Sequence, residues 1–539
     1  TTDSAAWQQQ DISGGLTKDV TGAENYTTVY TIAPSPVREG VIWAGTDDGN
    51  LHVTRNGGDS WTNVQGNMPG KPRHSWVSDV EASRYDAGTA FAVIHDFMRG
   101  DRATYVYRTA DFGRSWERLP TDEVAGFGRT LEQDPETRSL LWLGTEFGLY
   151  VSLDGGDSWS RWTRGFPNAV PVRAVTTQPE EGDLVVGTYG RAAYVLDDLE
   201  PLRAAARDPS VLDESLHLFD PPVATRHVEG ETQGYRSSGH AMFRGENAPY
   251  GALLTVNAEV APGQEAGGET AIAGDPEYPF TQVRGGERGE GGEPTRGATL
   301  EVLQGDSVVR RRDVELRDGF NRFTWNLRIH DFGREGSEAR MPGPQVVPGR
   351  YDLRLVSGSD TATGTVEVRG DPRADVPASG YRATYDAMVR VGHDAEVLSE
   401  AERRLQEARS GVATVLEATR GEDGYGALRQ RARRVKASLD SAYHETFEGP
   451  TCQGICAEDT VLGTLQGAYF GLFGAPGAPT DAQMLRVEEA EDEIAAALDR
   501  LNRLLSGPVS ELRDRVRETG LPLFPEVEPL GMEWRPGDR

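Results

Sequence analysis

Polar residues that could do chemistry follow a Gly-Thr pair at three places in the sequence. Asp47 and Asp48 follow the first pair, Glu146 follows the second, and Tyr189 with Arg191 follows the third. Two carboxylates that flank a glycosidic bond can hydrolyse it, and an arginine cluster with a tyrosine nucleophile is a second hydrolytic arrangement. We interpret these five residues as the rim of a binding site. Ordinary solvated loop residues are the alternative, because carboxylates are abundant throughout the chain.

Other catalytic and cofactor-binding motifs are absent from the sequence. There is no Gly-x-Ser-x-Gly elbow, no His-Glu-x-x-His and no phosphate-binding loop. The sequence therefore predicts no catalytic set, no cofactor and no metal site, although an Asp-rich turn can hold a structural calcium ion because hard cations prefer oxygen ligands. The segment 95–99, His-Asp-Phe-Met-Arg, forms a longer loop and is a further candidate for the same opening.

A repeated pattern, Ser/Thr-x-Asp/Asn-x-Gly-x-Ser-Trp, positions these residues. It occurs at 54–61, 109–116 and 152–159. Its acidic or amide members, Asn56, Asp111 and Asp154, can accept backbone N–H bonds across a hairpin while glycine takes the positive φ. Its closing tryptophans are Trp61, Trp116 and Trp159. An indole is large enough to pack between neighbouring sheets, so we interpret the acidic and amide residues as hairpin staples and not as ligands.

The Gly-Thr pairs recur in phase with these boxes. Ile42-Trp-Ala-Gly-Thr-Asp-Asp-Gly49 matches Leu141-Trp-Leu-Gly-Thr-Glu-Phe-Gly148, and Leu184-Val-Val-Gly-Thr-Tyr-Gly190 matches both. Strand, Gly-Thr turn, strand, box hairpin and strand recur every 43–55 residues, which is the length of a four-stranded propeller blade. The sequence predicts about four blades within residues 1–200: 26–64, 72–119, 127–162 and 170–198. Trp7 lies in a degraded box, so we expect the ring to continue N-terminally.

Boxes and Gly-Thr pairs together resemble Asp-box (BNR) β-propellers, the group that includes sialidases, xyloglucanases and the sortilin (VPS10) ectodomain. The order of blades, then Gly-Arg-Ala-Ala-Tyr-Val-Leu-Asp-Asp at 190–198, sandwich and helices is similar to large secreted bacterial proteins of sortilin-like type. Those proteins are often labelled glycosyl hydrolases because of the repeat. The resemblance covers nearly the whole chain, most specifically 25–200 and 460–524, and it implies a propeller used for binding. The sialidase Arg-Ile-Pro motif is missing.

The middle of the chain changes to short alternating strands. Residues 201–250 are interpreted as a connector, and 251–370 predict an immunoglobulin- or fibronectin-III-like β-sandwich because six short strands are separated by Gly-rich turns. The segment 261–297 is dense in Gly and Glu with few apolar residues, so we expect a mobile loop there.

From about residue 377 the hydrophobic period becomes helical. Residues 377–524 predict an α-helical bundle, and Thr480-Asp-Ala-Gln483 predicts a capping box at one helix start. Residues 525–539 are interpreted as a tail. The expected fold class is therefore multidomain and mainly β, with propeller blades, a sandwich and a C-terminal helical bundle.

Charge and cysteine content limit the partners and the compartment. The formal net charge of −29 argues against nucleic acid, which needs clustered cations, and no apolar run is long enough to span a membrane. Cys452 and Cys456 are interpreted as a disulfide, with two reduced cysteines as the alternative. A disulfide would place the protein outside the cytoplasm. The chain begins at Thr1, without methionine or signal peptide, so we expect a processed or truncated product that is extracellular, periplasmic or bound to the cell surface.

Three functions follow from these observations. The first is an exported binding or scaffold protein whose propeller recognises a protein, peptide or glycan, without catalysis in this chain. The second is a glycoside hydrolase, similar to xyloglucanases or sialidases, with an active site shared with missing blades. The third is a structural subunit that assembles with an N-terminal propeller fragment or with other subunits. The sequence favours the first.

Overall fold

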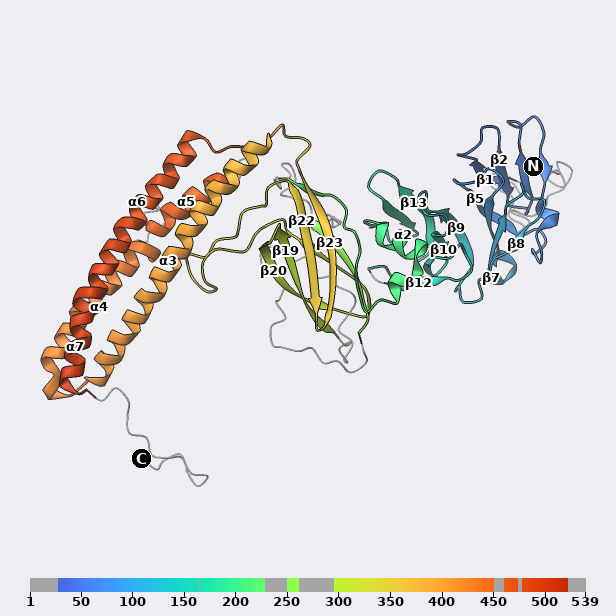
Figure 1. The fold of residues 1–539 in the computed structure, drawn as a ribbon. Helices are drawn as coiled ribbons and strands as arrows, with labels where there is room; N and C mark the ends of the chain where they lie inside the picture. Colours follow the sequence, from blue (N-terminus) through green and yellow to red (C-terminus); the bar gives the residue numbers. More distant parts are fainter. Residues whose placement is uncertain are drawn as a thin grey trace, which may run out of the picture.

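The structure is a computed structural model that describes residues 28–163, 165–227, 250–260, 295–449, 460–473 and 477–521. As the sequence predicts, the chain is mainly β with a helical C-terminal region. Figure 1 shows the blades in blue and green, the sandwich in yellow and the helices in orange and red. No helix in the described ranges is both long and apolar enough to cross a membrane. Cys452, Cys456 and the predicted tail lie outside the described residues, as does 261–294 of the predicted loop.

Four antiparallel sheets make up the N-terminal part, and we number them blades 1 to 4. Blade 1 contains β1 (Val29–Pro34), β2 (Ile42–Thr46), β3 (Leu51–Thr54) and β4 (Thr62–Asn63), and blade 2 contains β5 (Trp76–Ala82), β6 (Ala90–Asp96), β7 (Asp101–Thr109) and β8 (Glu117–Arg118). Blade 3 contains β9 (Gly128–Gln133), β10 (Leu141–Thr145), β11 (Gly148–Ser152) and β12 (Ser160–Trp162), and blade 4 contains β13 (Val172–Gln178), β14 (Asp183–Thr188) and β15 (Ala193–Leu196). Each strand pairs with the next one in sequence, which is the strand order of a propeller blade.

The box hairpins of blades 1, 2 and 3 are closed by the same hydrogen bonds. In blade 3, Asp154 Oδ1 accepts the backbone N–H of Ser158 at 2.9 Å, and the Ser152 hydroxyl accepts the N–H of Gly156 at 2.8 Å. Asp111 and Asn56 accept the equivalent N–H groups at 2.9 and 3.1 Å. The bonds from Ser115 also hold the pKa of Asp111 below its usual range. These bonds fix the turn that precedes each box tryptophan.

The box tryptophans of blades 2 and 3 pack against the preceding blade. Trp116 of blade 2 lies edge-on to Trp43 of blade 1, with ring centroids 5.9 Å apart. Trp159 of blade 3 is buried in a cluster that includes Phe91 and Val106 of blade 2. Burial of these rings between sheets stabilises the stacking of successive blades, because aromatic side chains bury large apolar areas.

The Gly-Thr pairs lie inside strands, so our interpretation of them as turns is wrong. Gly45 belongs to β2 and Gly144 belongs to β10. A Cβ atom on Gly45 would lie 2.4 Å from Cγ1 of Val77, and one on Gly144 would lie 2.6 Å from Cγ1 of Val172. Glycine is required there because a valine of the next blade occupies the space that a side chain would need.

Two packed sheets follow the blades. One contains β16 (Leu216–Leu218), β18 (Ala252–Ala258) and β21 (Gly319–Trp325), and the other contains β17 (Ala224–Arg226), β23 (Asp360–Gly370), β22 (Gly349–Ser357), β19 (Arg296–Gln304) and β20 (Ser307–Leu316). Residues such as Leu254 and Leu353 from the two sheets share one core. The connector interpretation of 201–250 is corrected here, because β16 and β17 from that segment extend both sheets. They are only three residues long, too short to show alternation. The immunoglobulin- or fibronectin-like topology stays a prediction.

The helical region packs onto the sandwich. It contains α3 (Ala378–Ala418), α4 (Gly426–Tyr443), α5 (Val461–Phe473), α6 (Asp481–Leu504) and α7 (Ser510–Thr519), with π-helical turns at His444–Glu448 and Leu505–Val509. The capping box is confirmed, because the hydroxyl of Thr480 accepts the N–H of Gln483 and the Gln483 side chain accepts the N–H of Thr480. Tyr469 Oη donates to the carbonyl of Pro342 at 2.6 Å, which ties α5 to the sandwich.

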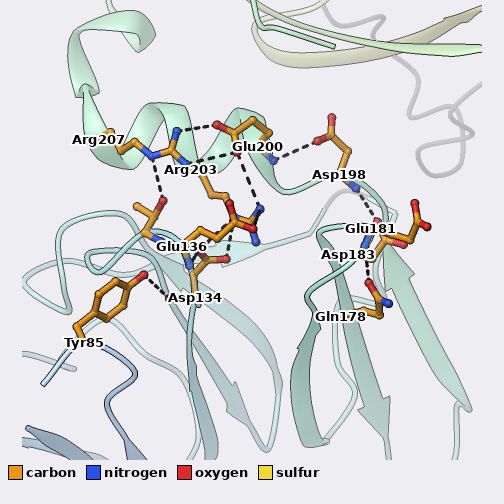
Figure 2. Close-up of polar contacts among 11 residues, drawn as sticks. Tyr85, Asp134, Glu136, Gln178, Glu181, Asp183, Asp198, Glu200, Arg203 and Arg207 are labelled. Atoms are coloured by element: carbon orange, nitrogen blue, oxygen red, sulfur yellow. Dashed lines mark hydrogen bonds and ion pairs between the residues drawn. The ribbon is translucent and has the colours of Figure 1, made fainter. Parts of the chain in front are cut away.

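A short helix, α2 (Glu200–Arg207), docks against blades 3 and 4. Figure 2 shows its arginines reaching toward the turn that follows β9. Arg203 Nε donates to both carboxylate oxygens of Asp134 at 3.1 and 3.0 Å, and Arg203 Nη1 pairs with Glu136 at 3.0 Å. Short 3-10 helices lie at Gln65–Asn67, Phe97–Arg99, Pro209–Leu212 and Asp423–Tyr425. The 201–250 segment therefore begins with a helix that is fastened to the propeller part.

Candidate ligand-binding cavity

The first strand of every blade carries one extra residue near its start. The register shifts by one residue where β1 pairs with β2, β5 with β6, β9 with β10 and β13 with β14. The extra residues are Tyr30, Ser78, Arg129 and Arg173. A β-bulge redirects the side chain of the inserted residue. The same irregularity, repeated in four blades, therefore places one side chain per blade at equivalent positions.

These four side chains line a single cavity of about 310 Å³. The remaining lining residues are Asp79, His95, Thr130 and Ala174. The first strands of neighbouring blades contact one another in the order β1, β5, β9, β13, so the cavity lies where the blades converge. A concave site at which several repeats meet is a common place for ligand binding.

The two arginines of the cavity differ in how they are held. Arg129 Nη2 forms an ion pair with Glu146 at 2.6 Å, and its Cζ lies 4.5 Å from the ring centre of Phe127. Arg173 is exposed, and its Cζ lies 5.1 Å from the ring centre of Tyr189. Among the described residues, no carboxylate forms an ion pair with Arg173. The cavity therefore presents one compensated and one uncompensated cation, although the chain as a whole is strongly acidic.

Asp79 is the one carboxylate among the described residues that line the cavity. Its Oδ2 accepts the hydroxyl of Thr130 at 2.8 Å and the N–H of Leu131 at 2.9 Å, and its Oδ1 accepts the N–H of Val80 at 2.9 Å. Burial raises its pKa in spite of these bonds. Asp79 consequently connects blade 2 to blade 3, and its oxygens are occupied by protein donors.

His95 lies deep in the cavity wall. Burial, followed by the charge of Arg129, lowers its pKa to about 4, so the imidazole is neutral near pH 7. Its ring contacts those of Trp76, Phe97 and Phe127, with centroids 5.5, 5.0 and 5.3 Å apart. The wall beside the arginines is therefore aromatic and can offer a neutral hydrogen-bonding nitrogen.

A pair of glutamates lies on the same first strands, further from the cavity. Burial, followed by the charges of Glu132 and Asp79, raises the pKa of Glu81 to about 8. Burial also raises the pKa of Glu132, whose Oε1 accepts the N–H of Thr177 at 3.2 Å. These groups join neighbouring blades and do not line the cavity.

The five residues that the sequence suggested as a rim lie around this region but not in the cavity wall. Asp47 accepts the N–H of Thr28 at 2.9 Å, and Asp48 accepts the hydroxyl of Thr46; both are almost completely buried. Glu146 and Tyr189 contact the lining arginines, as described above. Arg191 is exposed. The described lining residues include none of the five. The three acidic ones instead bind other residues of the blades through hydrogen bonds or an ion pair.

A repeat alignment of the first strands puts the four bulged residues at one equivalent position. Tyr30, Ser78 and Arg129 each lie 15 residues before the position that Gly45, Val93 and Gly144 occupy in the second strand, and Arg173 lies 14 before Gly187. The boxes and Gly-Thr pairs belong to later strands of each blade, so these motifs do not mark the lining positions on the first strands. Among the described residues, no group of three His, Cys, Asp or Glu side chains is arranged to hold a metal ion.

Fold and cavity together define a protein with β-propeller blades, a β-sandwich and helices, and with a cationic cavity where the blades meet. No protein-family model matches the chain. No curated protein matches it either.

Similar solved structures cover about a third of the chain. They include YCF48 bound to D1 peptide (17% identity, TM-score 0.26, 32% of this chain and 51% of that chain). They also include the GH74 xyloglucanase from Xanthomonas campestris (20% identity, TM-score 0.27, 32% and 29%) and YCF48 from Cyanidioschyzon merolae (16% identity, TM-score 0.24, 32% and 53%). The chain thus spans about half the length of the YCF48 structures and less of the xyloglucanase. The blades are defined by the pairing of their own strands.

Proposed function

We propose that this chain is an exported binding protein whose blades recognise a protein, peptide or glycan ligand through an anionic group placed in the cavity. In this proposal the chain is of the sortilin-like Asp-box type, and the immunoglobulin- or fibronectin-like sandwich and the helices are spacer and docking elements. The main support is the composition of the cavity wall: four residues at β-bulges, two of them arginines, line one opening.

The chemistry of the lining supports an anion as the recognised group. A guanidinium binds carboxylate, sulfate or phosphate with charge-assisted hydrogen bonds, and Arg173 has such donors to offer. Tyr30 adds a hydroxyl group and His95 adds an uncharged ring nitrogen, whereas the Ser78 hydroxyl already donates to the carbonyl of Val93 at 3.1 Å. A positive opening in a molecule of net charge −29 also concentrates anionic ligands at this one place.

The lining is less suited to glycoside hydrolysis. That reaction uses two carboxylates on opposite sides of the bond, one of which must give or take a proton. Asp79 is the one lining carboxylate in the described part of the chain, and three protein donors occupy its oxygens. Binding without catalysis therefore agrees better with these contacts than a hydrolase does.

The test is a peptide and glycan array probed with the 539-residue chain and with Arg173→Ala. We expect the wild-type chain to select ligands that carry carboxylate, sulfate or phosphate groups. Removal of Arg173 should weaken their binding by about tenfold or more, since a hydrogen bond to a charged group contributes about 1.5–3 kcal/mol. Binding should also fall as salt rises, because exposed charges are screened.

Arg118→Ala is the matched control. Arg118 is also exposed and also stacks on a tyrosine, with its Cζ 4.5 Å from the ring centre of Tyr105, but it lies outside the cavity. Equal loss of binding in both variants, or array hits without anionic groups, would contradict the proposal. Release of sugar from a polysaccharide by the wild-type chain, lost in Asp79→Asn, would instead support the hydrolase.

A further inference from the structure

Blade 1 exposes side chains that the other blades bury at the same stations. Ile32 is 66% exposed, whereas its equivalents Val80, Leu131 and Val175 are 4%, 2% and 6% exposed. The station of the box tryptophan behaves in the same way. Trp61 is 44% exposed, whereas Trp116 and Trp159 are each 7% exposed.

The position of Val29 shows which contact blades 2 and 4 make and blade 1 lacks within the described part of the chain. Val29 of β1 is 41% exposed, and the valines at the same station of blades 2 and 4, Val77 and Val172, are fully buried; blade 3 has Gly128 there. Those two valines are buried because each fills the space left by a glycine in the second strand of the preceding blade, Gly45 and Gly144 respectively. Val29 has the same side chain at the same station, but no described glycine receives it.

The sequence before blade 1 has the repeat period of a blade. Trp7 lies 54 residues before Trp61, and Trp61 lies 55 residues before Trp116. In the blades that contain a Gly-Thr pair and a box, the glycine precedes the box tryptophan by 16 residues (Gly45 to Trp61) or 15 residues (Gly144 to Trp159).

We propose that the face of blade 1 formed by Val29, Ile32 and Trp61 packs against a preceding blade of the same polypeptide. Trp7 lies outside the described residues, and its spacing in the sequence puts it at the position of a box tryptophan in the preceding repeat. The preceding blade supplies a glycine in its second strand, and Val29 fills the space beside it. The ring therefore continues on the N-terminal side of β1. This inference is independent of the ligand proposed for the cavity.

The first test is the nucleotide sequence upstream of the codon for Thr1. We expect an open reading frame that encodes a Gly-Thr pair with its glycine 15 or 16 residues before Trp7. A stop codon within that distance, or a large residue at both positions, would overturn the proposal, because Val29 would then have no space to enter.

The second test compares the 539-residue chain with the naturally extended chain by hydroxyl-radical footprinting. Oxidation of Trp61 should fall in the extended chain to the level of Trp116, which serves as the internal reference for a covered box tryptophan. Unchanged oxidation of Trp61 would overturn the proposal. So would a stable dimer of the 539-residue chain that already protects Trp61, since a second copy would then be the partner of this face.

Paired substitutions separate covering from simple misfolding. Ile32→Asp should hardly change the Tm of the 539-residue chain, in which the side chain is exposed, but should lower the Tm of the extended chain by about 3 °C or more. Val223→Asp is the control, because Val223 is 44% exposed and lies outside the blades. It should have equal effects in both chains. Equal effects of Ile32→Asp in both chains would contradict the proposed contact.

Discussion

The two ends of the first strands use the same ionic side chains in opposite ways. At the end where α2 docks, Arg203 and Asp134 are almost fully buried and joined by two hydrogen bonds. At the other end, Arg173 faces the cavity and stacks on Tyr189, with no described carboxylate to pair with it. The ion pair at the first end neutralises Arg203 and holds α2 in place. At the second end, Arg173 has no such ion pair among the described residues, so its charge is available to a ligand.

This difference explains why charge content alone could not locate a site. A buried arginine and carboxylate must be paired, because an unpaired charge in the interior costs several kcal/mol. An exposed arginine has no such requirement. The residues that matter for recognition are therefore those that the fold leaves without a partner, and these are a small part of a highly charged chain.

The largest effect is expected from breaking the buried pair. Asp134→Ala should lower the free energy of unfolding by about 3–5 kcal/mol, because it leaves the Arg203 guanidinium buried without its main partner. Urea denaturation followed by circular dichroism would measure this loss. Glu117→Ala is the control, since it breaks the exposed pair with Arg108 (2.8 Å) and should cost less than about 1 kcal/mol. Similar losses in the two variants would show that α2 is not fastened by this pair.

A smaller, pH-dependent effect is expected from Glu81, which lies between the two ends. Its pKa is raised from 4.5 to about 8, so the folded protein binds a proton that the unfolded chain releases. The stabilisation from this proton is complete below the unfolded pKa and is lost as the pH rises toward 8. We expect the free energy of unfolding to fall by about 1 kcal/mol or more between pH 5 and pH 9 on this account.

Glu81→Gln isolates that contribution, because glutamine is neutral at every pH and has nearly the same shape. Urea denaturation at pH 5 and pH 9 should show a smaller decrease for Glu81→Gln than for the wild-type chain. An unchanged decrease would show that Glu81 titrates normally in the folded protein.

The smallest effect on stability is expected from Glu146→Gln at the cavity. It removes the charge that compensates Arg129, so stability should fall by no more than about 1 kcal/mol. The affinity for an anionic ligand should rise by about two- to fivefold, because a second arginine becomes uncompensated. Binding titrations at low salt measure the change. Weaker binding would indicate that Glu146 itself contacts the ligand.

The fold could be read from the sequence wherever local patterns carried it. The boxes and Gly-Thr pairs indicated the strand order, the apolar period indicated the helices, and the capping box at Thr480 was confirmed. The two three-residue strands β16 and β17 were missed because alternation cannot be recognised over so few residues. His95 of the predicted segment 95–99 does line the cavity. The four bulged lining residues were missed because a bulge is a feature of strand pairing, and the residues around Arg129 or Arg173 show no local mark of it.

By itself, the sequence determined that this protein repeats a hairpin with a closing tryptophan and then changes to sandwich strands and helices. These features depend on backbone preferences and on apolar period, which are local. The tertiary structure decided which arginines are paired with carboxylates, because Arg203 and Arg173 differ only in the residues that the fold places near them. It also decided that Gly45 and Gly144 are spaces for the next blade, since a close approach between sheets exists only after the sheets have stacked.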